Sequence, residues 1–85
     1  MAGRAREGNV AYRRAFGQRL RELRSERGIS QEALALRTGI ARSYMGGIER
    51  GEKNPALDHI VRLASELALP PSELMPPVPA KRAEH

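Results

Sequence analysis

The side chains best suited to chemistry in this chain are Arg42, Ser43 and Tyr44, three consecutive hydrogen-bonding residues at the exposed start of a predicted helix. An arginine in such a place can form two parallel hydrogen bonds with guanine O6 and N7. A short helix over 31–38 and a turn centred on Gly39 precede these residues. Two short helices joined in this way can lay the second one into the major groove of DNA. The segment therefore predicts double-stranded DNA as the partner.

Apolar residues at helical spacing, separated by glycines and prolines, predict that the rest of the chain is also helical. Phe16, Leu20 and Leu23 fall at i, i+4 and i+7 and would form the apolar stripe of a first helix. We therefore expect an all-α fold, a compact bundle of about five short helices. The expected helices cover residues 10–27, 31–38, 41–50, 55–69 and 72–75.

Cap residues mark the boundaries of these helices. Gly28 and Gly51 follow the first and third predicted helices, where a glycine suits the left-handed residue that ends a helix. Ser30 is a good N-cap for the second helix, and Asn54 followed by Pro55 would begin the fourth.

A chain of 85 residues has room for one domain. We expect a flexible basic arm over 1–9, a helix-turn-helix domain over 10–75 and a Pro-rich disordered tail over 76–85. The N-terminus lacks an apolar signal segment, and no apolar run approaches the roughly 20 residues of a membrane-spanning helix. The sequence therefore favours a cytoplasmic protein without a membrane partner.

The composition argues against an enzyme and against a metal site. The chain has no cysteine, which excludes a disulfide framework, a thiolate zinc site and a cysteine nucleophile. Glu49 has no nucleophile, metal or second carboxylate with which to act as a general base, and His59 is the only histidine in the predicted domain. We therefore expect no catalysis, no metal and no cofactor.

The charge is unevenly distributed. Eight arginines and three glutamates within residues 1–27 account for the whole net charge of +5. An excess of this kind favours a polyanionic partner, but a solvated helix face would show it equally well.

Four motifs together resemble one protein family. They are GISQEALA at 28–35, TGI at 38–40, SYMGGIERG at 43–51 and NPAL at 54–57. These motifs are similar to those of the Cro and CI repressor type of helix-turn-helix protein, also called the xenobiotic-response-element type, and most similar to restriction–modification controller proteins. The resemblance implies a lambda-repressor-like DNA-binding domain. It also implies a homodimeric transcriptional regulator, acting as a repressor on an inverted-repeat operator in a bacterium or phage.

The resemblance also implies roles for individual residues. The expected base-reading residues are Arg42, Ser43, Tyr44 and Gly47. The expected phosphate-binding residues are Gln31, Tyr44, Arg50, Lys53 and Asn54. Gln31 begins the second helix, whose N-terminus favours an anion. Tyr44 has two interpretations: it packs partly into the core, or it offers its hydroxyl to a phosphate and its ring to a thymine methyl group.

Two features depart from the family pattern. Gly46 and Gly47 each cost a helix about 1 kcal/mol relative to alanine, and position 47 is where relatives often carry a reading side chain. We therefore expect fewer direct base contacts and more dependence on Arg42 and DNA shape. Ala41 stands where a capping serine or threonine is expected, which costs about 1 kcal/mol and predicts fraying of the third helix in the absence of DNA.

The resemblance further implies a partly buried ion pair between Arg24 and Glu49 that joins the first and third helices. Controller proteins dimerise through a longer fifth helix, which prolines from Pro76 onward shorten here. The expected dimer interface is the exposed edge of the fourth helix together with Leu69, Leu74 and Met75.

Two other functions stay open. The chain could be an antitoxin-like or other partner-binding helix-turn-helix protein, in which residues 76–85 become ordered on a protein partner. A non-specific or RNA-binding protein would use the same arginines. It is less favoured because the chain offers only Tyr12, Phe16 and Tyr44 as aromatic residues, too few for a stacking platform.

Overall fold

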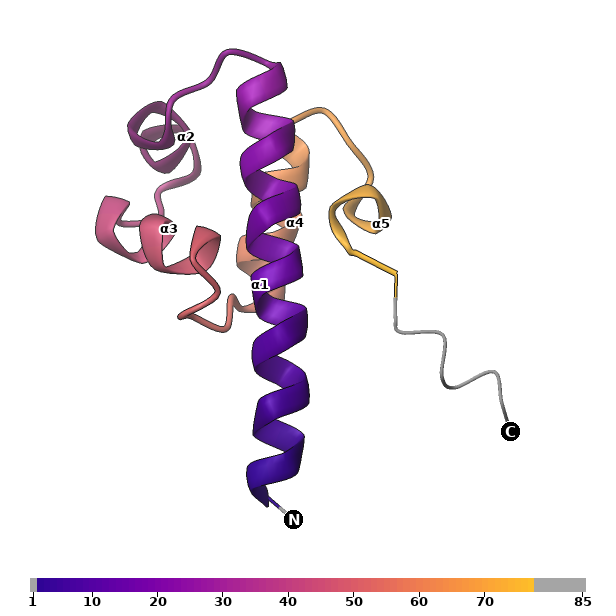
Figure 1. Ribbon diagram of the computed structural model, residues 1–85. Helices are drawn as coiled ribbons and strands as arrows, with labels where there is room; N and C mark the ends of the chain where they lie inside the picture. Colours follow the sequence, from indigo (N-terminus) through magenta and orange to yellow (C-terminus); the bar gives the residue numbers. More distant parts are fainter. Residues whose placement is uncertain (1, 78–85) are drawn as a thin grey trace.

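The structure, a computed structural model, describes residues 2–77, and over that range it contains helices and no strand. The helices, in chain order, are α1 (Ala2–Glu26), α2 (Gln31–Thr38), α3 (Arg42–Glu49), α4 (Leu57–Glu66) and α5 (Pro71–Leu74), as Figure 1 shows. The prediction of an all-α bundle of about five helices is confirmed. Residues 78–85, most of the predicted tail, lie outside the described residues. The expectation that this tail becomes ordered on a protein partner therefore stays a prediction.

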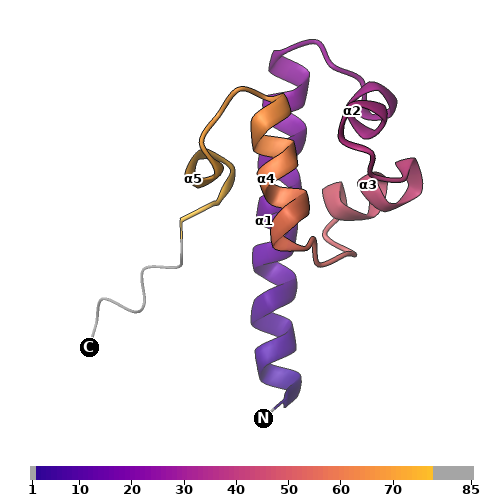
Figure 2. The same cartoon turned by 180° about the vertical axis from the view of Figure 1, so that it is seen from behind.

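Helix α1 begins at Ala2 and not at Val10, so the residues predicted as a flexible arm continue the helix. Both views show this N-terminal part projecting beyond the other helices (Figures 1 and 2). The segment has no apolar stripe, which is why the sequence pattern did not indicate a helix there. Its Ala, Arg and Glu residues are nevertheless good helix formers, and extending an existing helix is far easier than nucleating a new one.

One core joins all five helices. Its fully buried large side chains are Leu20, Leu34, Met45, Ile48, Leu63, Leu67 and Leu74. The predicted stripe of α1 belongs to this core, because Phe16 and Leu23 are buried beside Leu20. Helix α1 packs on α3 and α5, helix α2 packs on α3 and α4, and α4 packs on α5. In Figure 2, α2 and α3 lie on one side of α1 and α5 lies on the other.

The connection between α2 and α3 has the local structure that its sequence predicts. The hydroxyl of Ser30 caps α2 by accepting a hydrogen bond from the Ala33 amide at 3.0 Å. Gly39 ends the helix with a φ of 75°, a left-handed conformation that glycine adopts at no steric cost. The turn therefore brings α3 across α2 at a fixed position.

Helices α1 and α3 cross at a point where only a glycine fits. A Cβ at Gly17 would lie 2.5 Å from the carbonyl oxygen of Glu49 and 2.7 Å from its carbonyl carbon, and it would also meet the carbonyl oxygen of Ile48. The backbone of α3 therefore rests directly on α1, which fixes the depth at which α3 sits in the domain.

Helix α4 begins two residues later than predicted. Ala56, not Asn54, is its N-cap residue, and the Ala56 amide donates a hydrogen bond to Nδ1 of His59 at 3.4 Å. The carbonyl of Asn54 accepts a hydrogen bond from the hydroxyl of Tyr44 at 3.2 Å, and Ala56 is extended, so the helix starts at Leu57. At the other end, Ala68 has a φ of 58°, the left-handed position where glycine is usual.

The short helix α5 places Leu74 in the core, where the side chain is fully buried. Leu74 was expected at a dimer interface, and this expectation is wrong for the protomer as folded. The reason is that Pro70 and Pro71 turn the chain back toward α1 and α4, and Leu74 is the large apolar residue of α5 that can fill the space between them.

Candidate nucleic-acid interface

The start of α3 is open to solvent. Arg42 and Ser43 are both exposed, and Ala41 before them forms no side-chain cap hydrogen bond, so the side chain of that residue offers no acceptor to the first amides of α3. A guanidinium, a hydroxyl and free amides at one helix end can all donate to base edges or phosphate oxygens. This end of α3 is therefore the part of the described surface best equipped to recognise an anionic, hydrogen-bonding partner.

Tyr44 fits the first of its two interpretations, because it packs partly against the core, and its contact with DNA stays a prediction. It is half-buried, and its hydroxyl donates to the carbonyl of Asn54. Its ring and that of His59 meet edge to face, with ring centroids 5.4 Å apart, and Nζ of Lys53 lies 5.9 Å from the Tyr44 ring centroid. In the free protein Tyr44 therefore ties α3 to the loop that follows it. Both Asn54 and Lys53, expected to bind phosphate, are exposed on that loop.

The two glycines of α3 lie beneath polar side chains from elsewhere. A Cβ at Gly47 would be 2.6 Å from Cγ of Lys53 and 3.3 Å from its Cε, so the aliphatic part of Lys53 covers the position. A Cβ at Gly46 would be 3.1 Å from Nη1 of Arg50 and 3.4 Å from Oε1 of Gln31. The glycines thus let three expected DNA-binding side chains lie close along α3.

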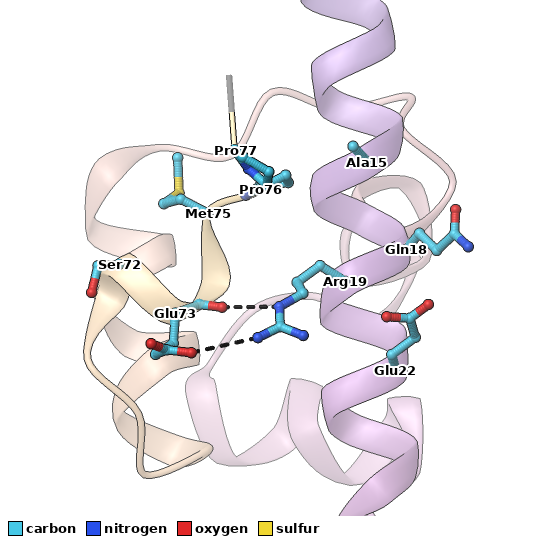
Figure 3. A pocket seen from close by; sticks show the side chains of 9 residues that line it. All are labelled: Ala15, Gln18, Arg19, Glu22, Ser72, Glu73, Met75, Pro76 and Pro77. Carbon is cyan, nitrogen blue, oxygen red and sulfur yellow. Dashed lines mark hydrogen bonds and ion pairs between the residues drawn. The ribbon is translucent and has the colours of Figure 1, made fainter. Parts of the chain in front are cut away.

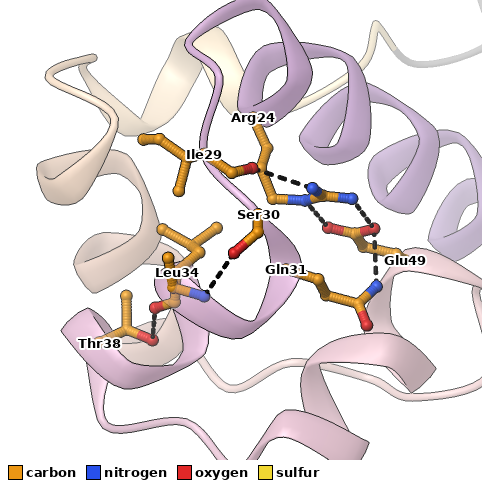
Figure 4. A network of polar contacts seen from close by, with 8 residues as sticks. Arg24, Ile29, Ser30, Gln31, Leu34, Thr38 and Glu49 are labelled. Carbon is orange, nitrogen blue, oxygen red and sulfur yellow. Dashed lines mark hydrogen bonds and ion pairs between the residues drawn. The ribbon is translucent and has the colours of Figure 1, made fainter.

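A buried carboxylate connects the first three helices (Figure 4). Glu49 of α3 accepts hydrogen bonds from Nε and Nη2 of Arg24 in α1, at 2.7 and 2.9 Å. It also accepts one from Nε2 of Gln31 at the start of α2, at 3.0 Å. The third nitrogen of Arg24 donates to the carbonyl of Ile29 at 3.0 Å. The structure thus brings Arg24 and Glu49 together as expected, and it also places the Gln31 side chain in the same network.

This network fixes electrostatics as well as geometry. The hydrogen bond to Glu49 raises the pKa of Arg24 above its usual value, although burial acts in the opposite direction. Both side chains are nearly buried, so their charges are compensated by each other and not by water. With its Nε2 held by Glu49, Gln31 keeps Oε1 directed toward Gly46 and Arg50.

Arg50, at the C-terminal end of α3, is exposed and paired with Glu52. Its Nε and Nη2 donate to the two carboxylate oxygens of Glu52 at 3.0 and 3.1 Å. This hydrogen bonding raises the pKa of Arg50 and lowers the pKa of Glu52. The sequence analysis missed Glu52, because a pair two residues apart depends on the path of a loop and has no spacing rule.

We define the phosphate seat as Gln31, the N-terminus of α2, Gly46 and Arg50. The amides at the start of α2 have no helical acceptor, and the helix dipole adds a partial positive charge there. Nη1 of Arg50 and Oε1 of Gln31 both lie close to the position that a Cβ at Gly46 would take, at 3.1 and 3.4 Å. The seat therefore brings the Gln31 side chain at the start of α2 and the Arg50 guanidinium to the same point on α3.

The described surface also has a hollow between α1 and α5. It is open and has a volume of about 380 Å³, and in it Arg19 donates to the carbonyl of Glu73 at 3.0 Å (Figure 3). The residues of this hollow are Ala15, Gln18, Arg19, Glu22, Ser72, Glu73, Met75, Pro76 and Pro77.

Within residues 2–77 no group of three or more His, Asp or Glu residues could hold a metal ion. None of the helices described is both long enough and apolar enough to cross a bilayer.

Comparison with known proteins agrees with this geometry. A family model described as a helix-turn-helix matches residues 20–74. The crystal structure of the restriction–modification controller protein C.AhdI from Aeromonas hydrophila is 52% identical in sequence with a TM-score of 0.75. The alignment covers 76% of this chain and 98% of that one.

Two further relatives are similar in sequence. Control protein C.BamHI of Bacillus amyloliquefaciens is 39% identical over 61 residues, which are 71% of this chain and 75% of that protein. The transcriptional regulator SinR of Bacillus subtilis is 36% identical over 53 residues, 61% of this chain and 48% of SinR. The matched region includes α2, α3 and the phosphate seat.

Proposed function

The chain belongs to the helix-turn-helix family of the Cro/CI type and is a DNA-binding transcriptional regulator, and from that premise we propose that it binds an inverted-repeat operator as a homodimer and represses transcription. Each protomer would place α3 in the major groove of one half-site, with the two half-sites about one helical turn (roughly 34 Å) apart. The observation that carries the proposal is the open start of α3 lying beside the phosphate seat.

Arg42 and Ser43 are the proposed base readers. Both are exposed on the first turn of α3, and arginine pairs with guanine O6 and N7 through two bonds worth about 1–3 kcal/mol of discrimination. Gly47 has no side chain and lies under Lys53, so we assign its groove-facing position to the stem of Lys53. Tyr44 would reach DNA only after giving up its bond to Asn54.

Gln31 and Arg50 are the proposed phosphate clamps, with Lys53 and Asn54 on the adjoining loop. The N-terminus of α2 favours an anion beside the backbone amide of Gln31. One N–H of the Gln31 side chain is held by Glu49, so its second N–H would be the donor to a phosphate. Contacts of this kind position the protein on DNA without reading sequence. Their removal should therefore weaken binding to every duplex alike.

A second copy of the chain is the proposed partner for the apolar surface of α4. Leu57 and Val61 are one helical turn apart and are 73% and 48% exposed, and Met75 after α5 is 39% exposed. Leu69, in the connection between α4 and α5, packs against the core and is half-buried. We propose Leu57, Val61, Leu69 and Met75 as the dimer surface, in place of the surface that included Leu74.

In the bacterial cytoplasm, a dimer bound at a promoter would exclude RNA polymerase from that promoter and so repress transcription. The similarity to C.AhdI and C.BamHI supports a controller role beside a restriction–modification locus.

The test is selection of bound duplexes from a random-sequence DNA pool at near-physiological salt, with the full chain. An inverted repeat with guanine at matching positions supports the proposal. Arg42→Ala should lose preference at that guanine, whereas Arg50→Ala should weaken all duplexes and make the salt dependence shallower by about one in log–log slope. Arg21→Ala, which removes an exposed arginine from α1, is the control. A pool in which nothing is enriched would instead favour the partner-binding alternative.

A further inference from the structure

An acidic side chain lies against the phosphate seat, and the proposed DNA contacts do not use it. Glu52 follows α3 in the chain and is 58% exposed. Its two carboxylate oxygens bind Nε and Nη2 of Arg50 at 3.0 and 3.1 Å. A negatively charged residue at this place is unexpected, because an incoming DNA backbone would repel it.

The carboxylate presents the same pattern to Arg50 that a phosphate would. Guanidinium groups bind carboxylates and phosphates alike through two parallel N–H···O bonds. Glu52 occupies one such edge of Arg50, while Nη1 lies on the other side, toward Gly46 and Gln31. A phosphate that takes two bonds from the Nε edge must therefore displace Glu52.

We propose that Glu52 is a competing anion, which occupies in the free protein the edge of Arg50 that a DNA phosphate takes in the complex. Each binding event then exchanges a carboxylate for a phosphate on one guanidinium. This inference rests on the proposed DNA-binding function. It assigns Glu52 the role of limiting how tightly the protein holds any duplex, and with it the time spent on non-operator DNA.

A simpler role for Glu52 predicts the opposite result. If the pair only stabilised the loop between α3 and α4, neutralising Glu52 would loosen Lys53 and Asn54 and weaken DNA binding. If Glu52 competes with phosphate, neutralising it strengthens binding. An exposed ion pair contributes little to stability, so the fold should tolerate the change.

The experiment measures dissociation constants of the full chain for an operator duplex and for a scrambled duplex of equal length, over a range of salt concentrations. Glu52→Gln should bind both duplexes about two- to fivefold more tightly, the effect expected from removing a weak competing ion pair. The slope of log affinity against log salt should steepen by about one, because a phosphate contact is no longer offset by a released carboxylate. Glu73→Gln is the matched control, since Glu73 is also 58% exposed and paired with an arginine, Arg19 (Figure 3).

The double variant Arg50→Ala/Glu52→Gln decides whether Glu52 acts through Arg50. Compared with Arg50→Ala alone, it should show no gain in affinity beyond that of the Glu73→Gln control. Unchanged or weaker binding by Glu52→Gln overturns the inference, and so does an equal gain in the Arg50→Ala background. A wild-type protein that does not prefer the operator would refute the proposed function instead, while the scrambled duplex would still test Glu52.

Discussion

The contact between α1 and α3 at Gly17 predicts a large loss of stability for Gly17→Ala. The added Cβ would lie 2.5 and 2.7 Å from backbone atoms of Glu49, whereas ordinary contacts of a Cβ begin near 3.4 Å. The overlap is about 1 Å, on the steep repulsive side of the van der Waals potential. Since the atoms it meets are backbone atoms of a packed helix, the overlap is relieved only by moving α3 away from α1.

Two opposing effects set the magnitude. Alanine favours the helical state over glycine by about 1 kcal/mol. Overpacking of a well-packed contact costs about 1–3 kcal/mol, and occasionally more where nothing can rotate aside. Because the contacts are with backbone atoms, we take the upper end of the overpacking range, about 3 kcal/mol, which leaves a net loss of about 2 kcal/mol in the free energy of unfolding. For a domain of this size that loss lowers Tm by about 8–16 °C.

Urea and thermal unfolding followed by far-ultraviolet circular dichroism would measure this change. Gln18→Ala, an exposed site next to Gly17 in the same helix, is the control and should stay within about 0.5 kcal/mol of wild type. If Gly17→Ala is as stable as wild type or more stable, helix propensity has prevailed. The close approach of α3 to α1 would then be refuted.

Three further changes test other features of the fold, each by urea unfolding. Ala68→Gly should raise stability by about 1 kcal/mol, because Ala68 is exposed with a φ of 58° that costs a non-glycine residue energy; no gain would argue against the left-handed end of α4. Ala41→Ser should add about 1 kcal/mol by capping α3, since Ala41 already has the extended conformation of an N-cap residue (ψ 140°); a loss of stability would contradict this geometry. Glu49→Ala should cost about 3 kcal/mol, because it leaves the nearly buried Arg24 without its partner; a cost under about 0.5 kcal/mol would show that the pair is solvated.

The helix-turn-helix unit could be predicted from sequence because its determinants are local. Ser30 and Gly39 act on the backbone within a few residues of themselves, and the apolar residues of α2 and α3 repeat at helical spacing. The meeting of Arg24 with Glu49 was expected only through family resemblance, since 25 residues separate them in the chain. Spacing alone carries no information on such a contact.

The features that escaped prediction depend on how the chain folds back on itself. Glu52 reaches Arg50 because Gly51 turns the chain with a φ of 78°, and Lys53 then returns over Gly47. The burial of Leu74 depends on how far Pro70 and Pro71 redirect the chain. The extra turns of α1 before Val10 escaped notice because a projecting helix needs no apolar stripe.

The glycines of this domain differ in how freely they could change during evolution. Gly17 faces rigid backbone, so a substitution there endangers the fold. Gly46 faces only the flexible ends of Arg50 and Gln31, which can move aside, whereas a Cβ at Gly47 would lie 2.6 Å from Cγ of Lys53 and would displace that whole side chain. A side chain acquired at position 46 would strengthen α3 as a helix by about 1 kcal/mol and at the same time add a new group where Arg50 and Gln31 now lie. A protein with this fold could therefore change the chemical groups at position 46 without first acquiring a stabilising mutation elsewhere.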